Sequence, residues 1–166
     1  MFGRGVPKDV LARLAIPDGE HVVAWANGVS GPSADGTHVV ATDRALYGVG
    51  ERLPWDRISR AQWDEPLLEV VVLDGNDQPG RLVRVRLAVG SQLPAAVHAK
   101  VTESVVVSER LVLDGGGGAL AVARRGSDDD RIRWSIVFDA GLDPTDPALR
   151  AQADQALARL RDSLGV

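Results

Sequence analysis

Residues 38–63, HVVATDRALYGVGERLPWDRISRAQW, contain the pattern that decides the expected fold. Largely apolar residues fill positions 38–42 and 45–49, and Asp43-Arg44 between them predicts a tight turn joining two short strands. Pro54-Trp55 marks a corner, and residues 58–63 then resume a strand pattern. The stretch therefore predicts antiparallel strands that change direction at a corner.

The segments on either side of this stretch extend the pattern. Residues 8–16 predict a short helix, residues 20–27 a first strand, and the stretch GVSGPSADG at 28–36 a loop. After the corner, LLEVVVL at 67–73 predicts a buried strand that pairs with 58–63, and DGNDQPG at 74–80 predicts a turn. Residues 81–87 alternate, with valine and leucine on one face and Arg84 and Arg86 on the other.

The C-terminal part of the chain predicts a helix, more strands and a second helix. Residues 92–104 have helical spacing, the run from 105 is β-rich, and the glycines at 115–118 predict a hairpin turn before a strand at 119–125. After a turn at 127–130, residues 131–138 alternate, which predicts four inward side chains, Ile132, Trp134, Ile136 and Phe138, and three outward ones, Arg131, Arg133 and Ser135. Asp146 predicts the N-cap of a last amphipathic helix, which Gly165 ends.

Three motifs resemble the bacterial pleckstrin-homology-like (PH-like) families. They are GEHVV at 19–23, VVATDRALY at 39–47, and LPWDRI at 53–58, where a Pro-Trp corner leads into the next strand. The resemblance covers about half of the chain, to about residue 107. It implies a mainly β (α+β) fold with two nearly orthogonal antiparallel sheets in a barrel-like arrangement, a capping helix, and a role in binding rather than catalysis.

The chain departs from the PH-like pattern in two ways. Members that bind phosphoinositides use basic residues around the first loop between strands, but residues 27–37 contain no Lys or Arg, which argues against inositol-lipid binding. The chain also continues past the expected cap, so either the helix at 92–104 or the one at 146–164 could hold that position. The expected plan is a helical segment at 1–19, a PH-like β domain at 20–107, and strands plus a helix at 108–166, packed on that domain or forming a unit of their own.

Composition limits the kinds of partner and the cellular compartment that we expect for this protein. The 166 residues include no cysteine, and 19 basic and 23 acidic residues give a net charge of -4, which does not favour nucleic acid or an anionic membrane as partner. No apolar run approaches the length of a membrane-spanning helix, and no secretory signal is visible, so the expected compartment is the cytoplasm. Arginine far outnumbers lysine, which is typical of a GC-rich bacterial genome of actinobacterial type.

The motifs that could indicate a phosphate, metal or catalytic site are better explained by ordinary structural roles. No Lys-Ser/Thr follows the glycines at 115–118, so a hairpin turn is favoured over a phosphate loop. Asp128-Asp129-Asp130 lacks the spacing of a calcium loop and is flanked by arginines, so a solvated turn is favoured. His21, His38 and His98 do not form a recognisable metal site. We expect no catalytic residue, metal or cofactor.

The candidate ligand-binding residues are four arginines and one tryptophan. If the strands that carry them are neighbours, the arginines would share a surface suited to an anionic ligand or an acidic peptide. Trp55 is either a core residue that fills the space between the sheets behind Pro54, or an exposed side chain that anchors a partner. The set is Arg84, Arg86, Arg131, Arg133 and Trp55.

Three functional hypotheses remain open from the sequence. The first is a binding or adaptor module that recognises a protein partner. The second is a protein that binds a small anion or an acyl chain between a sheet and a helix, and the third is an enzyme that uses spatially paired carboxylates. Exposed sheet edges also allow self-association.

Overall fold

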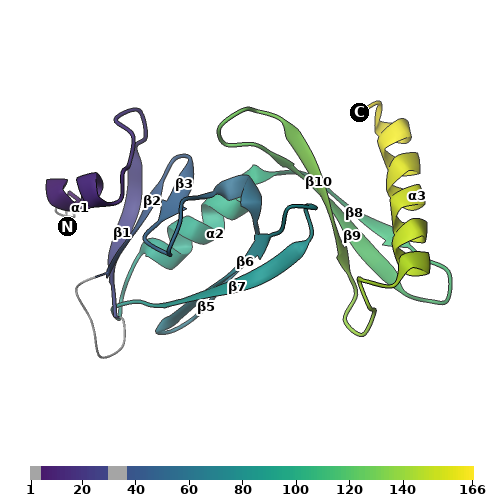
Figure 1. Cartoon of the computed structure of the whole chain (residues 1–166), viewed down its shortest axis with the longest axis horizontal. Helices are drawn as coiled ribbons and strands as arrows, with labels where there is room; N and C mark the ends of the chain where they lie inside the picture. The colour runs from purple at the N-terminus through teal and green to yellow at the C-terminus, as the bar shows by residue number, and fades with distance from the viewer. Residues whose placement is uncertain (1–4, 30–36) are drawn as a thin grey trace.

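The computed structural model describes residues 5–29 and 37–166, which form three antiparallel sheets and a few helices (Figure 1). The fold is mainly β, as predicted, with the N-terminal helix at one end of the long axis and the C-terminal helix at the other. From residue 30 onward, the loop expected at 28–36 lies outside the described residues. Within the described ranges, no helix is both long enough and apolar enough to cross a bilayer.

The first sheet has the order β1-β2-β3-β4. Its strands are β1 (Val22–Gly28), β2 (Thr37–Thr42), β3 (Ala45–Tyr47) and β4 (Leu53–Pro54). The turn predicted at Asp43-Arg44 forms because the Thr42 hydroxyl accepts hydrogen bonds from the backbone N–H groups of Arg44 and Ala45, at 3.1 and 3.0 Å. Helix α1 (Lys8–Arg13) covers the outer face of this sheet through the buried Val10.

The predicted corner is a short 3-10 helix, η1 (Trp55–Arg57), between the first and second sheets. The second sheet has the order β5-β6-β7, with β5 (Ile58–Asp64), β6 (Leu67–Leu73) and β7 (Pro79–Arg86). The pairing of β5 with β6 is confirmed. The turn between β6 and β7 forms because the Asp74 carboxylate accepts the backbone N–H groups of Asn76 and Gln78, at 2.8 and 3.0 Å.

Helix α2 (Leu93–Ser104) packs against strands of both sheets. Its Leu93 and Val97 are 0 % exposed and lie in one apolar core with residues of β2, β3, β5 and β6. The first and second sheets meet at a single bridge between Gly28 and Leu87. They do not form the closed barrel that the resemblance implied, because this bridge is the only ladder contact between them in the described part of the chain.

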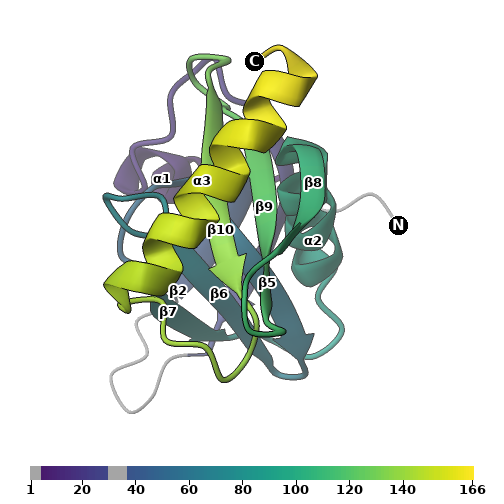
Figure 2. The same cartoon turned by 90° about the vertical axis from the view of Figure 1, so that its right-hand side faces the viewer.

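The third sheet has the order β10-β9-β8 and carries the last helix. It comprises β8 (Val105–Val112), β9 (Gly118–Arg125) and β10 (Ile132–Phe138). Helix α3 (Pro147–Leu164) lies across one face of this sheet (Figure 2) and packs on a cluster that includes Leu111 and Ile136. The predicted cap is confirmed, since the Asp146 carboxylate accepts the Ala148 N–H at 2.9 Å and Gly165 ends the helix with φ 73°.

The predicted faces of β10 are wrong at two positions. Ile132 is 41 % exposed although it was expected to face inward, and Ser135 is 2 % exposed although it was expected to face outward. Ser135 is buried because Arg124 of β9 crosses this face, donating to the Ser135 hydroxyl and to the Ser59 carbonyl, both at 3.0 Å. Strand alternation assigns side chains to two faces, but here both faces of β10 are partly covered by other elements.

Candidate functional site

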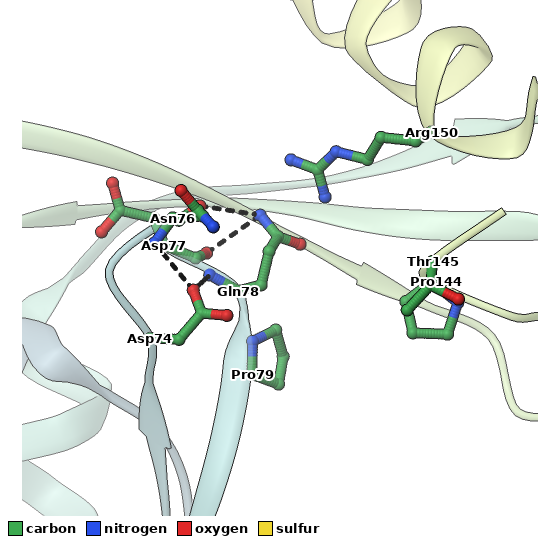
Figure 3. Close-up of a pocket in the computed structure, with 8 residues that line it drawn as sticks. All are labelled: Asp74, Asn76, Asp77, Gln78, Pro79, Pro144, Thr145 and Arg150. Carbon is green, nitrogen blue, oxygen red and sulfur yellow. Dashed lines mark hydrogen bonds between the residues drawn. The ribbon is translucent and has the colours of Figure 1, made fainter. Parts of the chain in front are cut away.

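A cleft separates the β6–β7 turn from the segment that leads into α3 (Figure 3). Its main part has a volume of about 640 Å³, and an adjoining hollow of about 280 Å³ shares Gln78, Pro79 and Pro144 with it. We call the two parts together the hairpin cleft. The main part is lined by Asp74, Asn76, Asp77, Gln78, Pro79, Pro144, Thr145 and Arg150.

One wall of the hairpin cleft is a rigid turn. Asp77 has a left-handed backbone with φ 58°, and its carboxylate forms an ion pair with Arg57 of η1. The same guanidinium donates to the Leu73 carbonyl at 3.2 Å. Since Arg57 bonds to both the side chain and the backbone of this hairpin, the turn is held against η1 in a defined position.

Gln78 presents an unpaired acceptor from this wall. Its side-chain Nε2 donates to the carbonyls of Asn76 and Asp77, at 3.3 and 3.1 Å, and these two bonds fix which way the amide faces. Its Oε1 is buried and has no hydrogen-bond partner among the described residues. Figure 3 shows this oxygen on the side of the amide that faces Arg150 and Thr145. A buried acceptor without a donor is unfavourable by about 1–3 kcal/mol, so a donor-bearing occupant would be stabilised here.

The opposite wall is built by the start of α3 and the residues before it. Thr145 donates from its N–H and its hydroxyl to the Asp143 carboxylate, at 2.9 and 2.7 Å, and these bonds lower the pKa of Asp143. Arg150 extends from α3 toward the cleft, and its Nε lies 3.3 Å from Asp154. The adjoining hollow is more apolar, with Phe138, Leu142 and Pro144 in its lining. The cleft thus combines hydrogen-bonding groups with an apolar end.

The four predicted arginines do not form the expected shared surface. Arg84 and Arg86 lie on β7 and Arg131 and Arg133 lie on or beside β10, and these strands belong to different sheets. Arg84 is exposed and pairs with Glu69 at 2.6 Å, and Arg131 is exposed with Asp129 at 3.9 Å. Arg133 instead donates to the buried Asp56 at 3.0 Å and to Asp129, so it acts as a structural contact.

Trp55 is a core residue rather than an exposed anchor. It is 2 % exposed, and its indole N–H donates to the Thr42 carbonyl at 3.1 Å. That Trp55 contacts a ligand stays a prediction, and its buried position favours the other expectation, a core residue behind Pro54.

Asp128 and Asp129 both form ion pairs, and that of Asp128 reaches across the fold. Arg52 donates to both oxygens of Asp128, at 2.7 and 2.8 Å, and lowers its pKa, while Arg133 lowers the pKa of Asp129. Arg52 also donates to the buried Glu20 at 2.7 Å. In the described ranges, no three His, Asp or Glu side chains gather where they could share a metal ion.

Sequence reasoning did not find Gln78 or Arg150. The only available signals were the strong turn pattern DGNDQPG and the polar face of the last helix. Nothing in either pattern indicates that the two segments face each other.

No protein-family model, curated protein or solved structure matches this chain.

Proposed function

We propose that this protein is a non-catalytic binding module of the bacterial cytoplasm, PH-like over residues 20–107, that recognises a protein partner through the hairpin cleft. The observation that carries the proposal is the buried Oε1 of Gln78, an acceptor of fixed orientation that has no donor among the described residues. Such a group discriminates strongly in favour of an occupant that donates a hydrogen bond to it.

The order of elements supports the PH-like part of the proposal. A four-stranded antiparallel sheet is followed by a three-stranded one and then by α2, which packs against strands of both. Of the two helices considered for the capping position, α2 has these contacts, whereas α3 packs on the third sheet.

The charge states of the carboxyl groups favour binding over catalysis. In the described part of the chain, every carboxyl with a shifted pKa has it lowered by a hydrogen-bond donor, and these groups are Asp128, Asp129, Asp139 and Asp143. A general acid at neutral pH needs a raised pKa. None of these four carboxyls has the raised pKa that a general acid requires.

The packing of α2 favours a surface site over an internal one. The alternative function, binding of an acyl chain or anion between a sheet and a helix, requires space where Leu93 and Val97 are fully buried. The apolar hollow beside Phe138, at about 280 Å³, is smaller than most small-molecule pockets. The main part, at about 640 Å³, is large enough for a small molecule, but it is lined largely by polar side chains, whereas small-molecule pockets are mostly apolar, and this lining favours a polypeptide.

Site-specific photo-cross-linking tests the proposed function. A photoreactive residue at the exposed Pro79, in the cleft, is compared with one at Val89, which is 80 % exposed and does not line the cleft. We expect one partner protein to be linked from position 79 and not from 89. The purified partner should then bind the chain stoichiometrically, and Gln78→Leu should weaken this binding about tenfold while the exposed Gln62→Leu leaves it unchanged. Equal linking from both positions, or catalytic turnover that survives Gln78→Leu, would overturn the proposal.

A further inference from the structure

The carboxylate of Asp74 is left without a cation in the hairpin cleft. Its Oδ1 accepts two backbone N–H groups of the β6–β7 turn, at 2.8 and 3.0 Å, and it pairs with no cationic side chain among the described residues. The other two carboxylates of the lining are balanced, since Asp77 pairs with Arg57, and Asp139 with Arg110 at 2.9 Å. The turn thus holds Asp74 at the cleft with its charge unbalanced.

The cation in the cleft lining does not remove this charge. Arg150 is paired along its own helix, with its Nε 3.3 Å from the Asp154 carboxylate, and it forms no hydrogen bond to the β6–β7 turn in the described part of the chain. A further carboxylate, that of Asp143, precedes the lining residues of the opposite wall and bonds to Thr145 rather than to a cation. The cleft therefore carries an excess of negative charge.

The unpaired acceptor of Gln78 lies on the same wall as Asp74. Figure 3 shows both side chains on the β6–β7 turn, and both line the main part of the cleft. The buried Oε1 of Gln78 requires a hydrogen-bond donor, and the Asp74 carboxylate requires a positive charge. These are separate requirements, and a cationic side chain with several N–H groups meets both.

Apolar surface lies beside these two acceptors. Pro79 and Pro144 line both parts of the cleft from opposite walls. Long cationic side chains pack their methylene stems on such surface while the charged head reaches polar groups. The adjoining hollow has Phe138 and Leu142 in its lining and suits an apolar side chain next to the cation.

From this juxtaposition we infer that the hairpin cleft recognises an arginine side chain of the partner protein, with its guanidinium between the Gln78 Oε1 and the Asp74 carboxylate, and an apolar side chain of the same segment in the adjoining hollow. The inference rests on the proposed function and names the chemistry that the partner presents. Arginine suits the cleft better than lysine because its planar guanidinium directs five donors in fixed directions, toward an amide oxygen and a carboxylate at once.

An acidic segment suits the cleft less well. The sequence favoured an acidic peptide or an anion, because four arginines were expected to share one surface, and that surface does not form. A carboxylate in the cleft would be repelled by Asp74 and would offer no donor to Gln78. The preference of the cleft is therefore opposite in sign to the one expected.

A set of capped peptides tests the inference on the intact protein. The first has the sequence glycine-leucine-glycine-arginine-glycine, in which an extended chain places leucine and arginine on one side, roughly 7 Å apart. In three others the arginine is replaced by citrulline, which keeps donors but has no charge, by norleucine, which has neither, or by glutamate. NMR titration of the Gln78 side-chain amide gives the affinities. We expect the citrulline peptide to bind about two- to fivefold more weakly than the arginine peptide, and the other two at least about tenfold more weakly. Equal affinity of the norleucine and arginine peptides would overturn the inference.

Variants of the protein separate the charge from the donor. Asp74→Asn keeps the turn acceptor, so it should lower the affinity of the arginine peptide to that of the citrulline peptide and leave the citrulline affinity unchanged. Asp114→Asn, the same change at an exposed position of the β8–β9 hairpin, should alter neither. Gln78→Leu should weaken both peptides about tenfold but not the norleucine peptide. In the unaltered protein, added salt should weaken the arginine peptide alone. Arginine binding that is insensitive to both salt and Asp74→Asn would contradict the charge pairing.

The two proposals fail in different ways. If a partner cross-links at position 79 but the peptides show no preference for arginine, the proposed function stands and the inference is wrong. If the peptides show the expected order but no protein is linked from position 79, the cleft binds arginine and the proposed function is wrong.

Discussion

Arg52 and Asp128 are 76 residues apart in the chain and form a two-bond ion pair, at 2.7 and 2.8 Å, that joins the β3–β4 loop to the β9–β10 turn. Close by, Arg133 of β10 donates to Asp56 of η1 at 3.0 Å. The third sheet is therefore attached to the rest of the fold through buried and half-buried polar contacts.

Arg52 should matter more for stability than its partner Asp128. Arg52→Gln removes the guanidinium from the Glu20 carboxylate, whose side chain is 4 % exposed, so we expect a loss of about 2–4 kcal/mol in the free energy of unfolding. Asp128→Asn removes only a half-exposed partner and should cost about 1 kcal/mol or less. Urea denaturation measures both, with Glu103→Gln in the exposed Lys100–Glu103 pair as control. A larger loss for Asp128→Asn than for Arg52→Gln would contradict this order.

Acid should loosen the attachment of the third sheet. Arg52 holds the pKa of Asp128 below its ordinary value of 3.8. A carboxyl with a depressed folded-state pKa stabilises the fold fully above its unfolded pKa, and this contribution is lost as pH falls through the folded pKa. We therefore expect stability to fall below about pH 4 and not between about pH 6 and 8. Thermal denaturation across this range should show a smaller acid effect for Asp128→Asn, and an identical acid effect in both proteins would exclude this origin.

Trp55 should affect stability and not binding. Trp55→Phe keeps a buried aromatic ring, but it removes the indole donor to the Thr42 carbonyl and leaves space where the larger indole lay, so we expect a loss of about 1–3 kcal/mol. Trp63→Phe, at a half-buried position without such a bond, should cost less. Chemical denaturation gives both values. The affinity for the partner protein that cross-links at position 79 should be unchanged in Trp55→Phe, and a clear loss of affinity would support this residue as a ligand contact.

Gly48 should tolerate alanine less well than Gly50. Both have a left-handed backbone, with φ 87° and 95°, so alanine is strained at either site. At Gly48 a Cβ would also lie 1.9 Å from the His38 carbonyl oxygen, whereas at Gly50 it would meet open space. We expect Gly50→Ala to cost about 1 kcal/mol and Gly48→Ala distinctly more, because β2 would have to move. Denaturation midpoints of the two variants provide the test, and equal midpoints would contradict it.

The local elements could be predicted because each depends on groups that are close in sequence. Thr42 bonds the turn that follows it, Asp74 bonds the turn it begins, and Asp146 caps the helix it precedes. In each case donor and acceptor are at most four residues apart, so the residue types and their spacing contain the information.

The burial of the two faces of β10 could not be predicted from short-range patterns. Alternation correctly separates Trp134 and Ile136 from Arg133 and Ser135, but it does not show that Arg124 and Asp56 cover the second face. The expected arginine surface failed for the same reason, because a strand pattern does not reveal which sheet the strand joins.

The sequence by itself determined the β-rich composition, the turns, the corner at Pro54-Trp55 and the cap of the last helix, since these follow from short-range hydrogen bonds and apolar periodicity. Only the tertiary structure decided that Gln78 faces the start of α3, that Arg124 covers the second face of β10, and that Arg52 reaches Asp128. These relationships join segments far apart in the chain, and they are set by the packing of whole sheets against one another rather than by the preferences of neighbouring residues.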